Sequence, residues 1–315
     1  MSSEIMKVLI TGGAGFLGSH LAEKCIDEGF TVNVVDNLSN GSLNNLQKIL
    51  GRKSFSFIKG DVKDKKLFYK LPKDFDVIFH LAANMKSNKE VFEDNVDGTK
   101  NILEVMRKND IEAKFIYTSS TRAMGFINFN GPLNESLPCN PDTLYGKSKY
   151  LAEKIIEEFG EKYGFKTIIF RLPRIYGPRD WQKTFYHLMK LIKFGVAPRI
   201  DLKLNLIYVK NLVHGLMLAC REKRSKGTYI ITDGKAFEIN EIVKTIEEIL
   251  KKKAKIRIKL PKYTFKFYSL LTNSFRYALK DVTYSIEKVK KELGYRPIYN
   301  LKKGIFETMK WCKIL

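Results

Sequence analysis

A glycine-rich turn at residues 12–18 most constrains what this chain can fold into. The apolar run Val8–Ile10 precedes it, and residues 19–28 follow with apolar side chains at helical spacing. This order predicts a buried strand, a tight turn and a helix. The glycines fit both the GxGxxG and the GxxGxxG spacing of a dinucleotide fingerprint, in which bare backbone approaches a pyrophosphate at a helix N-terminus. A purely structural glycine turn is the alternative.

An acidic residue ends the second expected strand. Residues 31–35 form a β-branched run that leads into Asp36, about 20 residues beyond the glycines, where a carboxylate can bind the adenosine ribose hydroxyls. No Arg or Lys follows until Lys48, so this loop offers no cation to bind the 2′-phosphate of NADP. The sequence therefore predicts NAD over NADP. Alternatively, Asp36 only caps the loop, since Asn37 and Asn40–Gly41 also indicate a turn.

Composition places the chain among globular proteins with one large domain or two modest ones. It has 315 residues, of which 44% are hydrophobic and 12% aromatic, enough for a sizeable core. The four cysteines are scattered and form no CxxC pair, which argues against disulfide, zinc or other metal frameworks and fits a reducing cytoplasm. We expect no signal peptide, and no apolar run reaches the roughly 18 residues of a membrane span. The expected location is the cytoplasm.

A net charge of +22 is the strongest bias in the composition. A nucleic acid, an anionic membrane or an anionic ligand such as a nucleotide would benefit from it, but we favour a lysine-rich solvated surface and expect no specific nucleic-acid binding. The run Lys251–Lys262 holds seven basic residues and no acid, and its alternation suits a half-buried strand with a basic outer face. The aromatic, basic segment Pro261–Leu271 fits core or a pocket wall better than peripheral membrane contact through an interfacial helix.

Strand and helix patterns alternate along the rest of the chain. This order is typical of α/β proteins with a parallel sheet, in which ligands bind at the carboxyl ends of the strands. Ser119, Ser120 and Thr121 stand at such an end, whereas we expect His80 to be packed rather than catalytic. Further strands are expected at 55–58, 76–83, 114–118, 167–171, 204–209 and 228–232, and helices at 63–71, 95–108, 144–163, 183–194, 212–221, 239–252, 286–293 and 301–311.

Tyr145 and Lys149 form a YxxxK pattern at the start of the expected helix 144–163. Residues four apart share one face of a helix, and a nearby ammonium lowers a phenol pKa from about 10. The pair is therefore a candidate general acid/base for a hydroxyl proton, with Ser120 holding the same oxygen. The alternative is a surface Tyr and Lys at ordinary helical spacing.

Taken together, these motifs resemble those of the extended short-chain dehydrogenase/reductase family, which includes NAD-dependent epimerases and dehydratases. The resemblance covers nearly the whole chain. It rests on TGGAGFLG at 11–18, DNLSNG at 36–41, GDV at 60–62, HLAA at 80–83, NxxGT at 95–99, SST at 119–121, YGKSK at 145–149, IYGPR at 175–179 and ELGYRP at 292–297.

The resemblance implies a Rossmann-type doubly wound parallel sheet with a smaller C-terminal substrate-binding domain. The NAD-binding domain would span 1–175 and 205–232, and the substrate-binding domain 176–204 and 233–315. It also implies a homodimer formed through the helices that begin near Asn95 and Tyr145.

Residue roles follow from the same resemblance. Tyr145 would be the acid/base, Lys149 would bind the nicotinamide ribose and lower the pKa of Tyr145, and Ser120 would orient the substrate. Residues expected to bind NAD are Gly12, Gly15, Phe16, Leu17, Gly18, Asp36, Asn37, Ser39, Asn40, Gly41, Asp61, Val62, Leu81, Ala82, Ala83, Asn95, Ser119, Tyr145, Lys149 and Pro173. Candidate substrate residues are Thr121, Arg122, Arg174 and Arg179.

The substrate is the least constrained inference. DNLSNG resembles UDP-galactose 4-epimerases and related nucleotide-sugar enzymes, but those usually carry Asn where Arg174 stands and Arg near Leu204. Residues 171–173 and 209–213 look more like the 3β-hydroxysteroid dehydrogenase and dihydroflavonol reductase branch. We favour a nucleotide sugar, with the three candidate arginines as diphosphate partners. An alcohol dehydrogenase or ketone reductase and a non-catalytic dinucleotide-binding module are the alternatives.

Overall fold

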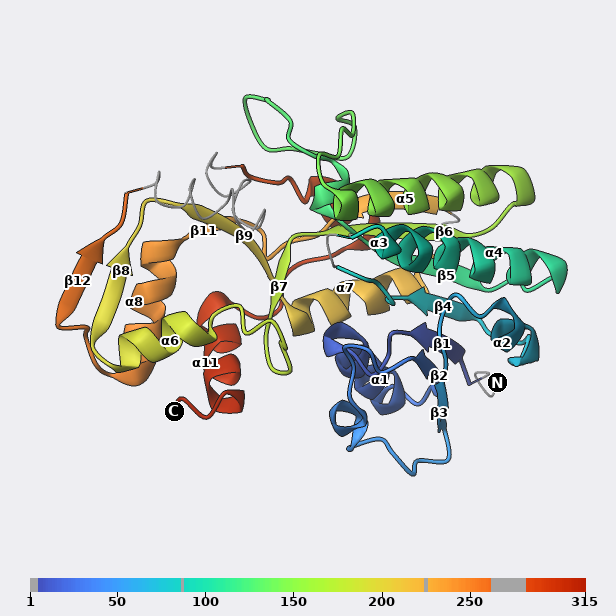
Figure 1. Cartoon of the computed structure of the whole chain (residues 1–315), viewed down its shortest axis with the longest axis horizontal. Helices are drawn as coiled ribbons and strands as arrows, with labels where there is room; N and C mark the ends of the chain where they lie inside the picture. The colour runs from blue at the N-terminus through green and yellow to red at the C-terminus, as the bar shows by residue number, and fades with distance from the viewer. Residues whose placement is uncertain (1–4, 86–87, 224–225, 262–281) are drawn as a thin grey trace. The chain divides into compact units, whose positions relative to one another are not determined.

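The computed structural model describes residues 5–85, 88–223, 226–261 and 282–315 (Figure 1). It divides into two compact units. The first comprises Met1–Ile127, Glu135–Leu172 and Gly215–Tyr229, and the second comprises Asn128–Asn134, Pro173–His214 and Ile230–Leu315. Apart from Pro261, the aromatic, basic segment Pro261–Leu271 lies outside the described residues.

A seven-stranded parallel sheet forms the centre of the first unit, in the order β10-β6-β5-β4-β1-β2-β3. On β1, Val8 pairs with Val32 on one side and with Val77 on the other, so buried β-branched residues stack across the sheet. This confirms the predicted α/β, Rossmann-type doubly wound fold. The strands are β1 (Lys7–Thr11), β2 (Thr31–Asp36), β3 (Phe55–Lys59), β4 (Val77–His80), β5 (Lys114–Ser120), β6 (Thr167–Leu172) and β10 (Lys226–Ile230).

Helices cover both faces of this sheet (Figure 1). On one face, Cys25 of α1 contacts Met217 of α7, with 3.8 Å between the two sulfurs. On the other, α4 packs between α2 and α5 over a core that includes Phe115, Ile102 and Ile156. The helical segments are α1 (Phe16–Asp27), η1 (Leu43–Leu46), α2 (Lys65–Lys70), α3 (Glu90–Phe92), η2 (Glu93–Asp97), α4 (Gly98–Lys108), η3 (Thr121–Ala123), α5 (Leu144–Tyr163) and α7 (Val209–Arg221).

The second unit contains two small sheets, ordered β11-β9-β7 and β12-β8. Its strands β7, β8, β11 and β12 have three or four residues each, too few for β7, β8 and β11 to give a periodic sequence signal. The strands are β7 (Arg174–Tyr176), β8 (Val196–Arg199), β9 (Lys203–Tyr208), β11 (Ala236–Glu238) and β12 (Ile256–Lys259), and the helices are α6 (Tyr186–Lys193), α8 (Ile239–Leu250), α10 (Glu287–Leu293) and α11 (Leu301–Trp311).

A polar pair of a buried Asn211 and a half-buried Asp233 fixes the C-terminal part of the second unit. Asn211 donates to Asp233 at 2.7 Å, and its carbonyl oxygen accepts from the backbone N–H groups of Ile298 and Tyr299. Burial raises the pKa of Asp233 to about 6. These hydrogen bonds hold in place the irregular segment at Ile298 and Tyr299, which comes directly after the ELGYRP motif.

Lys114, at the start of β5, caps the C-terminal end of α7. Its buried ammonium donates to the carbonyls of Ala219 and Cys220, each at 3.0 Å, and to that of Glu222. A cation at a helix C-terminus satisfies carbonyls that have no partner inside the helix and complements the dipole. One side chain therefore ties α7 to the central sheet.

Replacing Lys114→Met should lower the free energy of unfolding by about 2 kcal/mol, because hydrogen bonds to charged groups contribute about 1.5–3 kcal/mol. Urea unfolding followed by circular dichroism measures the change. Lys166→Met, at an exposed lysine of the same unit, is the control. Equal effects of the two substitutions would contradict the capping role.

Candidate active site

The glycine turn between β1 and α1 leaves no room for a side chain at Gly12 or Gly18. Gly12 has φ +72°, and a Cβ there would lie 2.8 Å from the backbone nitrogen of Ala82. At Gly18 a Cβ would lie 2.2 Å from the carbonyl oxygen of Gly12. Gly15 caps α1 with no side-chain hydrogen bond, so the first N–H groups of the helix, beginning with Phe16 and Leu17, face outward for an anion. The turn therefore fits a pyrophosphate.

Asp36 sits at the end of β2, directly beside that turn. Its carboxylate accepts from the backbone N–H of Ala14 at 2.9 Å and from that of Leu38 at 2.7 Å, and burial raises its pKa. A Cβ on Gly41 would lie 2.9 Å from the same carboxylate, so the 36–41 loop folds tightly around it. The backbone N–H of Gly15 also bonds this carboxylate, which leaves one of its about four lone-pair sites for a hydroxyl donor.

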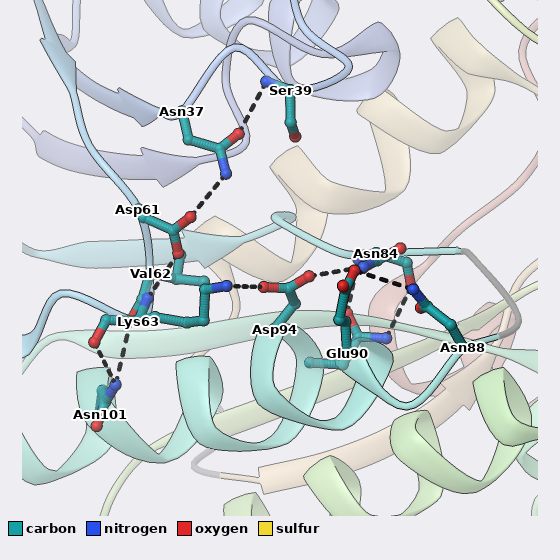
Figure 2. A network of polar contacts seen from close by, with 11 residues as sticks. Asn37, Ser39, Asp61, Val62, Lys63, Asn84, Asn88, Glu90, Asp94 and Asn101 are labelled. Atoms are coloured by element: carbon teal, nitrogen blue, oxygen red, sulfur yellow. Dashed lines mark hydrogen bonds and ion pairs between the residues drawn. The ribbon is translucent and has the colours of Figure 1, made fainter.

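A polar network leads from this loop to the next strand ends (Figure 2). Asn37 accepts from the N–H of Ser39 at 2.9 Å and donates to Asp61 at 2.8 Å. Asp61 also accepts from the N–H of Lys63, and Lys63 pairs with Asp94 at 3.0 Å. Burial of Val62 beneath the network gives the site a partly apolar floor. The loops after β2 and β3 are thus held in register, as an adenine site requires.

The same network continues to the loop after β4. Asp94 accepts from the side chain of Asn84 at 2.6 Å (Figure 2). The buried Asn95 exchanges two hydrogen bonds with the backbone of Asn84 and donates to Ser148 of α5 at 2.9 Å. The side-chain oxygen and nitrogen of Asn95 are thus both hydrogen-bonded within the protein, and they hold the loop after β4 in place. Sequence reasoning missed Asn84 and Asp94, which lack a motif of their own.

Small residues after β4 lie against the glycine turn. The N–H groups of Leu81 and Ala82 donate to the backbone and side-chain oxygens of Thr11, respectively. His80 is fully buried between the hydroxyls of Thr11 and Thr99, at 2.7 and 2.9 Å, and burial lowers its pKa to about 3. The structure therefore agrees with a neutral, packed His80.

Lys149 is buried beneath the carboxyl end of β5. Thr143 caps α5 and thereby sets its first turn. From the second turn, the Lys149 ammonium donates to the carbonyl of Thr118 at 2.9 Å and to the hydroxyl of Tyr117 at 3.1 Å. Burial lowers the pKa of Lys149 to about 7, while the carboxylate of Glu153 opposes that shift. Tyr117 was not singled out by the sequence, because it sits inside an ordinary strand pattern.

The structure brings Tyr145, Ser120 and Arg122 together. Burial raises the pKa of Tyr145 to about 12, opposed by the charge of Arg122 and by a hydrogen bond with Ser120. This differs from the expected lowering of the phenol pKa by Lys149. The reason is physical: desolvation outweighs the nearby charges, and the ammonium of Lys149 is turned toward Tyr117 and Thr118.

Ser119 and Thr121, the two neighbours of Ser120 in the sequence, lie in different environments. The hydroxyl of Ser119 donates to the buried carboxylate of Glu153, which also pairs with Arg171 at 2.7 Å. Ser119 therefore links β5, α5 and β6. Thr121 is buried in η3. Pro173, Arg174 and Arg179 belong to the second unit, where Arg174 lies on β7 and Arg179 has a left-handed φ of +68°.

Comparison with known proteins now decides the family. Residues 8–232 match the NAD-dependent epimerase/dehydratase family. The chain belongs to this family. It is thus an enzyme of the NAD-dependent epimerase/dehydratase type, which confirms the resemblance predicted from the sequence, and its cofactor is NAD.

Three relatives illustrate the breadth of the family. A provisionally assigned UDP-glucose 4-epimerase of Methanocaldococcus jannaschii is 31% identical, covering 97% of this chain and 98% of its own. A 3β-hydroxysteroid dehydrogenase/Δ5→4-isomerase of Mycobacterium tuberculosis is 26% identical, covering 98% and 91%. The crystal structure of UDP-glucose 4-epimerase with UDP-glucose from Thermotoga maritima is 25% identical with a TM-score of 0.82, covering 98% and 99%.

The described part of the chain contains no helix that is long and apolar enough to cross a membrane.

The environment of Asp36 predicts a cofactor preference. We expect NAD to bind at least about tenfold more tightly than NADP, a difference of about 1.4 kcal/mol, because a 2′-phosphate would meet the Asp36 carboxylate. Calorimetric titration of the purified protein with each dinucleotide measures this. Asp36→Ala should narrow the difference. Equal or tighter NADP binding by the wild-type protein would contradict the prediction.

Proposed function

We propose that this enzyme acts on a nucleotide-activated sugar, in the manner of a UDP-glucose 4-epimerase. The observation that carries the proposal is the end-to-end similarity to the M. jannaschii protein, at 31% identity. The similarity in fold to the T. maritima structure, which contains UDP-glucose, also supports the proposal. The net charge of +22 also favours an anionic substrate.

Tyr145 is the proposed acid/base. When bound, NAD accepts and returns a hydride at a sugar carbon, so a proton must leave and rejoin the attached hydroxyl. With a pKa near 12 in the free protein, the phenol is protonated at neutral pH and serves as the acid. Arg122 and Ser120 stabilise the phenolate and therefore favour the base form.

Lys149 and Ser120 have separate proposed roles. The Lys149 ammonium uses two N–H groups on Thr118 and Tyr117, which leaves a third for the nicotinamide ribose hydroxyls. Ser120 would orient the reacting hydroxyl of the sugar. The Ser119–Glu153–Arg171 link fixes the end of β5 and so keeps Ser120 at a constant position relative to α5.

The diphosphate of the substrate needs cationic partners, because burying it unpaired is costly. We propose Arg122, Arg174 and Arg179 for this role, since Leu204 stands where related nucleotide-sugar enzymes usually carry Arg. Thr121 would add a hydroxyl at the substrate site.

We also propose that the enzyme works as a homodimer through α4 and α5. Leu144 and Leu151 of α5 are exposed, Leu151 by 44%, although they lie on a helix whose other face is packed in the core. Light scattering measures the mass in solution, and a monomer would contradict this part of the proposal.

The expected location remains the cytoplasm.

A dehydrogenase or reductase is the second candidate, favoured by the similarity to the M. tuberculosis 3β-hydroxysteroid dehydrogenase. An epimerase returns its NAD unchanged and can retain it, whereas a dehydrogenase exchanges the cofactor at every turnover. Mass analysis of the small molecules released from the denatured protein distinguishes the two. Retained NAD with a nucleotide sugar supports the epimerase.

Tyr145→Phe should reduce turnover by about 10²–10⁴-fold, the contribution of a general acid/base, while NAD affinity stays nearly constant. Steady-state kinetics with UDP-glucose or UDP-galactose, together with NAD titration, measures both effects. Tyr150→Phe, five residues along the same helix, is the matched control. Turnover of Tyr145→Phe within twofold of wild type would remove Tyr145 from the mechanism.

Arg174→Ala or Arg179→Ala should weaken UDP-sugar binding by about 1.5–3 kcal/mol, as expected for hydrogen bonds between charged groups, without a matching loss of NAD affinity. Titration of the NAD-loaded protein measures the change, and Arg296→Ala at an exposed position of the same unit is the control. If the wild-type protein binds neither UDP, dTDP nor GDP at millimolar concentration, the nucleotide-sugar proposal fails and the dehydrogenase candidate replaces it.

A further inference from the structure

The second unit carries an exposed edge that the proposed reaction does not use. We call it the basic edge and define it as α6 residues 190–193, the turn Phe194–Gly195 and residues 251–259. The N–H of Ile256 donates to the carbonyl of Gly195 at 3.0 Å, and Lys252 donates to the carbonyl of Lys193 at 3.1 Å. Pairing of β12 with β8 extends this contact, so the segments form one continuous surface.

Positive charge accumulates on the basic edge. Residues 251–259 contain six basic side chains and no acidic one, and all six are exposed. The carboxylate of Glu247, which lies beneath them, is buried and paired with Arg257 at 2.8 Å. Within the described part of the chain, no carboxylate lies within ion-pair distance of Lys251, Lys253 or Lys255, although the charge of Lys253 helps to lower the pKa of Glu247. Lys190 and Lys193 add charge from α6.

Large apolar side chains are also exposed along the basic edge. Phe194 is 77% exposed, the highest value among the large hydrophobic residues that the structure describes, and Ile256 and Ile258 of β12 are 58% and 47% exposed. Leu191 of α6 adds to this group. Arg257 turns toward Glu247 of α8, so by strand alternation Lys255 and Lys259 lie on the same side of β12 as Arg257, and the two isoleucines lie on the other side. The long alkyl stems of the lysines let their ammonium groups reach past the strand toward the isoleucine side. Exposed apolar groups gathered at one place commonly mark an interaction site.

We propose that the basic edge docks on a membrane surface that contains anionic phospholipids. Lysines attract the headgroups, and a phenyl ring with aliphatic neighbours enters the boundary of the acyl chains. Phe194 is the one side chain of this group that can stack on a nucleic-acid base, whereas Leu191, Ile256 and Ile258 cannot, so the apolar part of the edge suits acyl chains better than bases. A second copy of the chain would bring like charges together. The proposal is independent of the proposed function, because the site residues of the first unit are not involved.

Cosedimentation with vesicles tests the proposal. The full chain is mixed with vesicles of phosphatidylcholine alone or of phosphatidylcholine with phosphatidylglycerol, and free protein is measured after centrifugation. We expect binding only to the anionic vesicles. The triple variant Lys251→Glu/Lys253→Glu/Lys255→Glu should lose more than about tenfold in partitioning, and Phe194→Ala should lose severalfold. NAD titration verifies that each variant is folded.

A charge-matched control separates the basic edge from the net charge of the protein. Lys48→Glu/Lys53→Glu/Lys66→Glu changes three exposed lysines of the first unit by the same amount and should retain vesicle binding. Equal losses in the two triple variants would overturn the proposal. It would also be overturned if Phe194→Ala bound vesicles like wild type, or if single-stranded RNA bound more tightly than the vesicles and displaced them.

Discussion

Backbone contact at the glycine turn is the constraint on which the first unit depends. Gly18 lies so close to the carbonyl of Gly12 that a methyl group would overlap it, and a methyl group on Gly12 would come too close to the backbone of Ala82. Because these contacts join the first turn of α1, the end of β1 and the loop after β4, they bring three parts of the chain together. The N–H groups of α1 consequently face the same side as the ends of β2, β3 and β4.

Burial governs the chemistry of the candidate active site more than charge does. Both Tyr145 and Lys149 are desolvated, and each pKa moves toward the neutral form, to about 12 for the phenol and about 7 for the ammonium. Arg122, Ser120 and Glu153 oppose these shifts. The free protein therefore keeps Tyr145 neutral and Lys149 partly protonated at neutral pH, in a site where the buried Glu153–Arg171 pair joins α5 to β6.

Much of the fold could be predicted because its signals are local. The expected helices at 144–163 and 301–311 match α5 and α11 to the residue, and the main strands agree within a few residues. Helix 95–108 is less regular than expected: α4 starts at Gly98, and residues Glu93–Asp97 form a π-helical turn. The short strands β7, β8 and β11 depend on partners far along the chain, so no local pattern predicts them.

The sequence by itself determined the family, the α/β fold and NAD as cofactor, because glycines, strand ends and the YxxxK spacing act through local backbone geometry. Only the tertiary structure decided which groups surround those residues. Tyr117 and Thr118 accept hydrogen bonds from Lys149. Glu153 accepts the hydrogen bond of the Ser119 hydroxyl, and Asn84 donates to the side chains of Asp94 and Asn95. These partners come from different strands and helices, and their effect depends on desolvation, which arises only when the elements pack together.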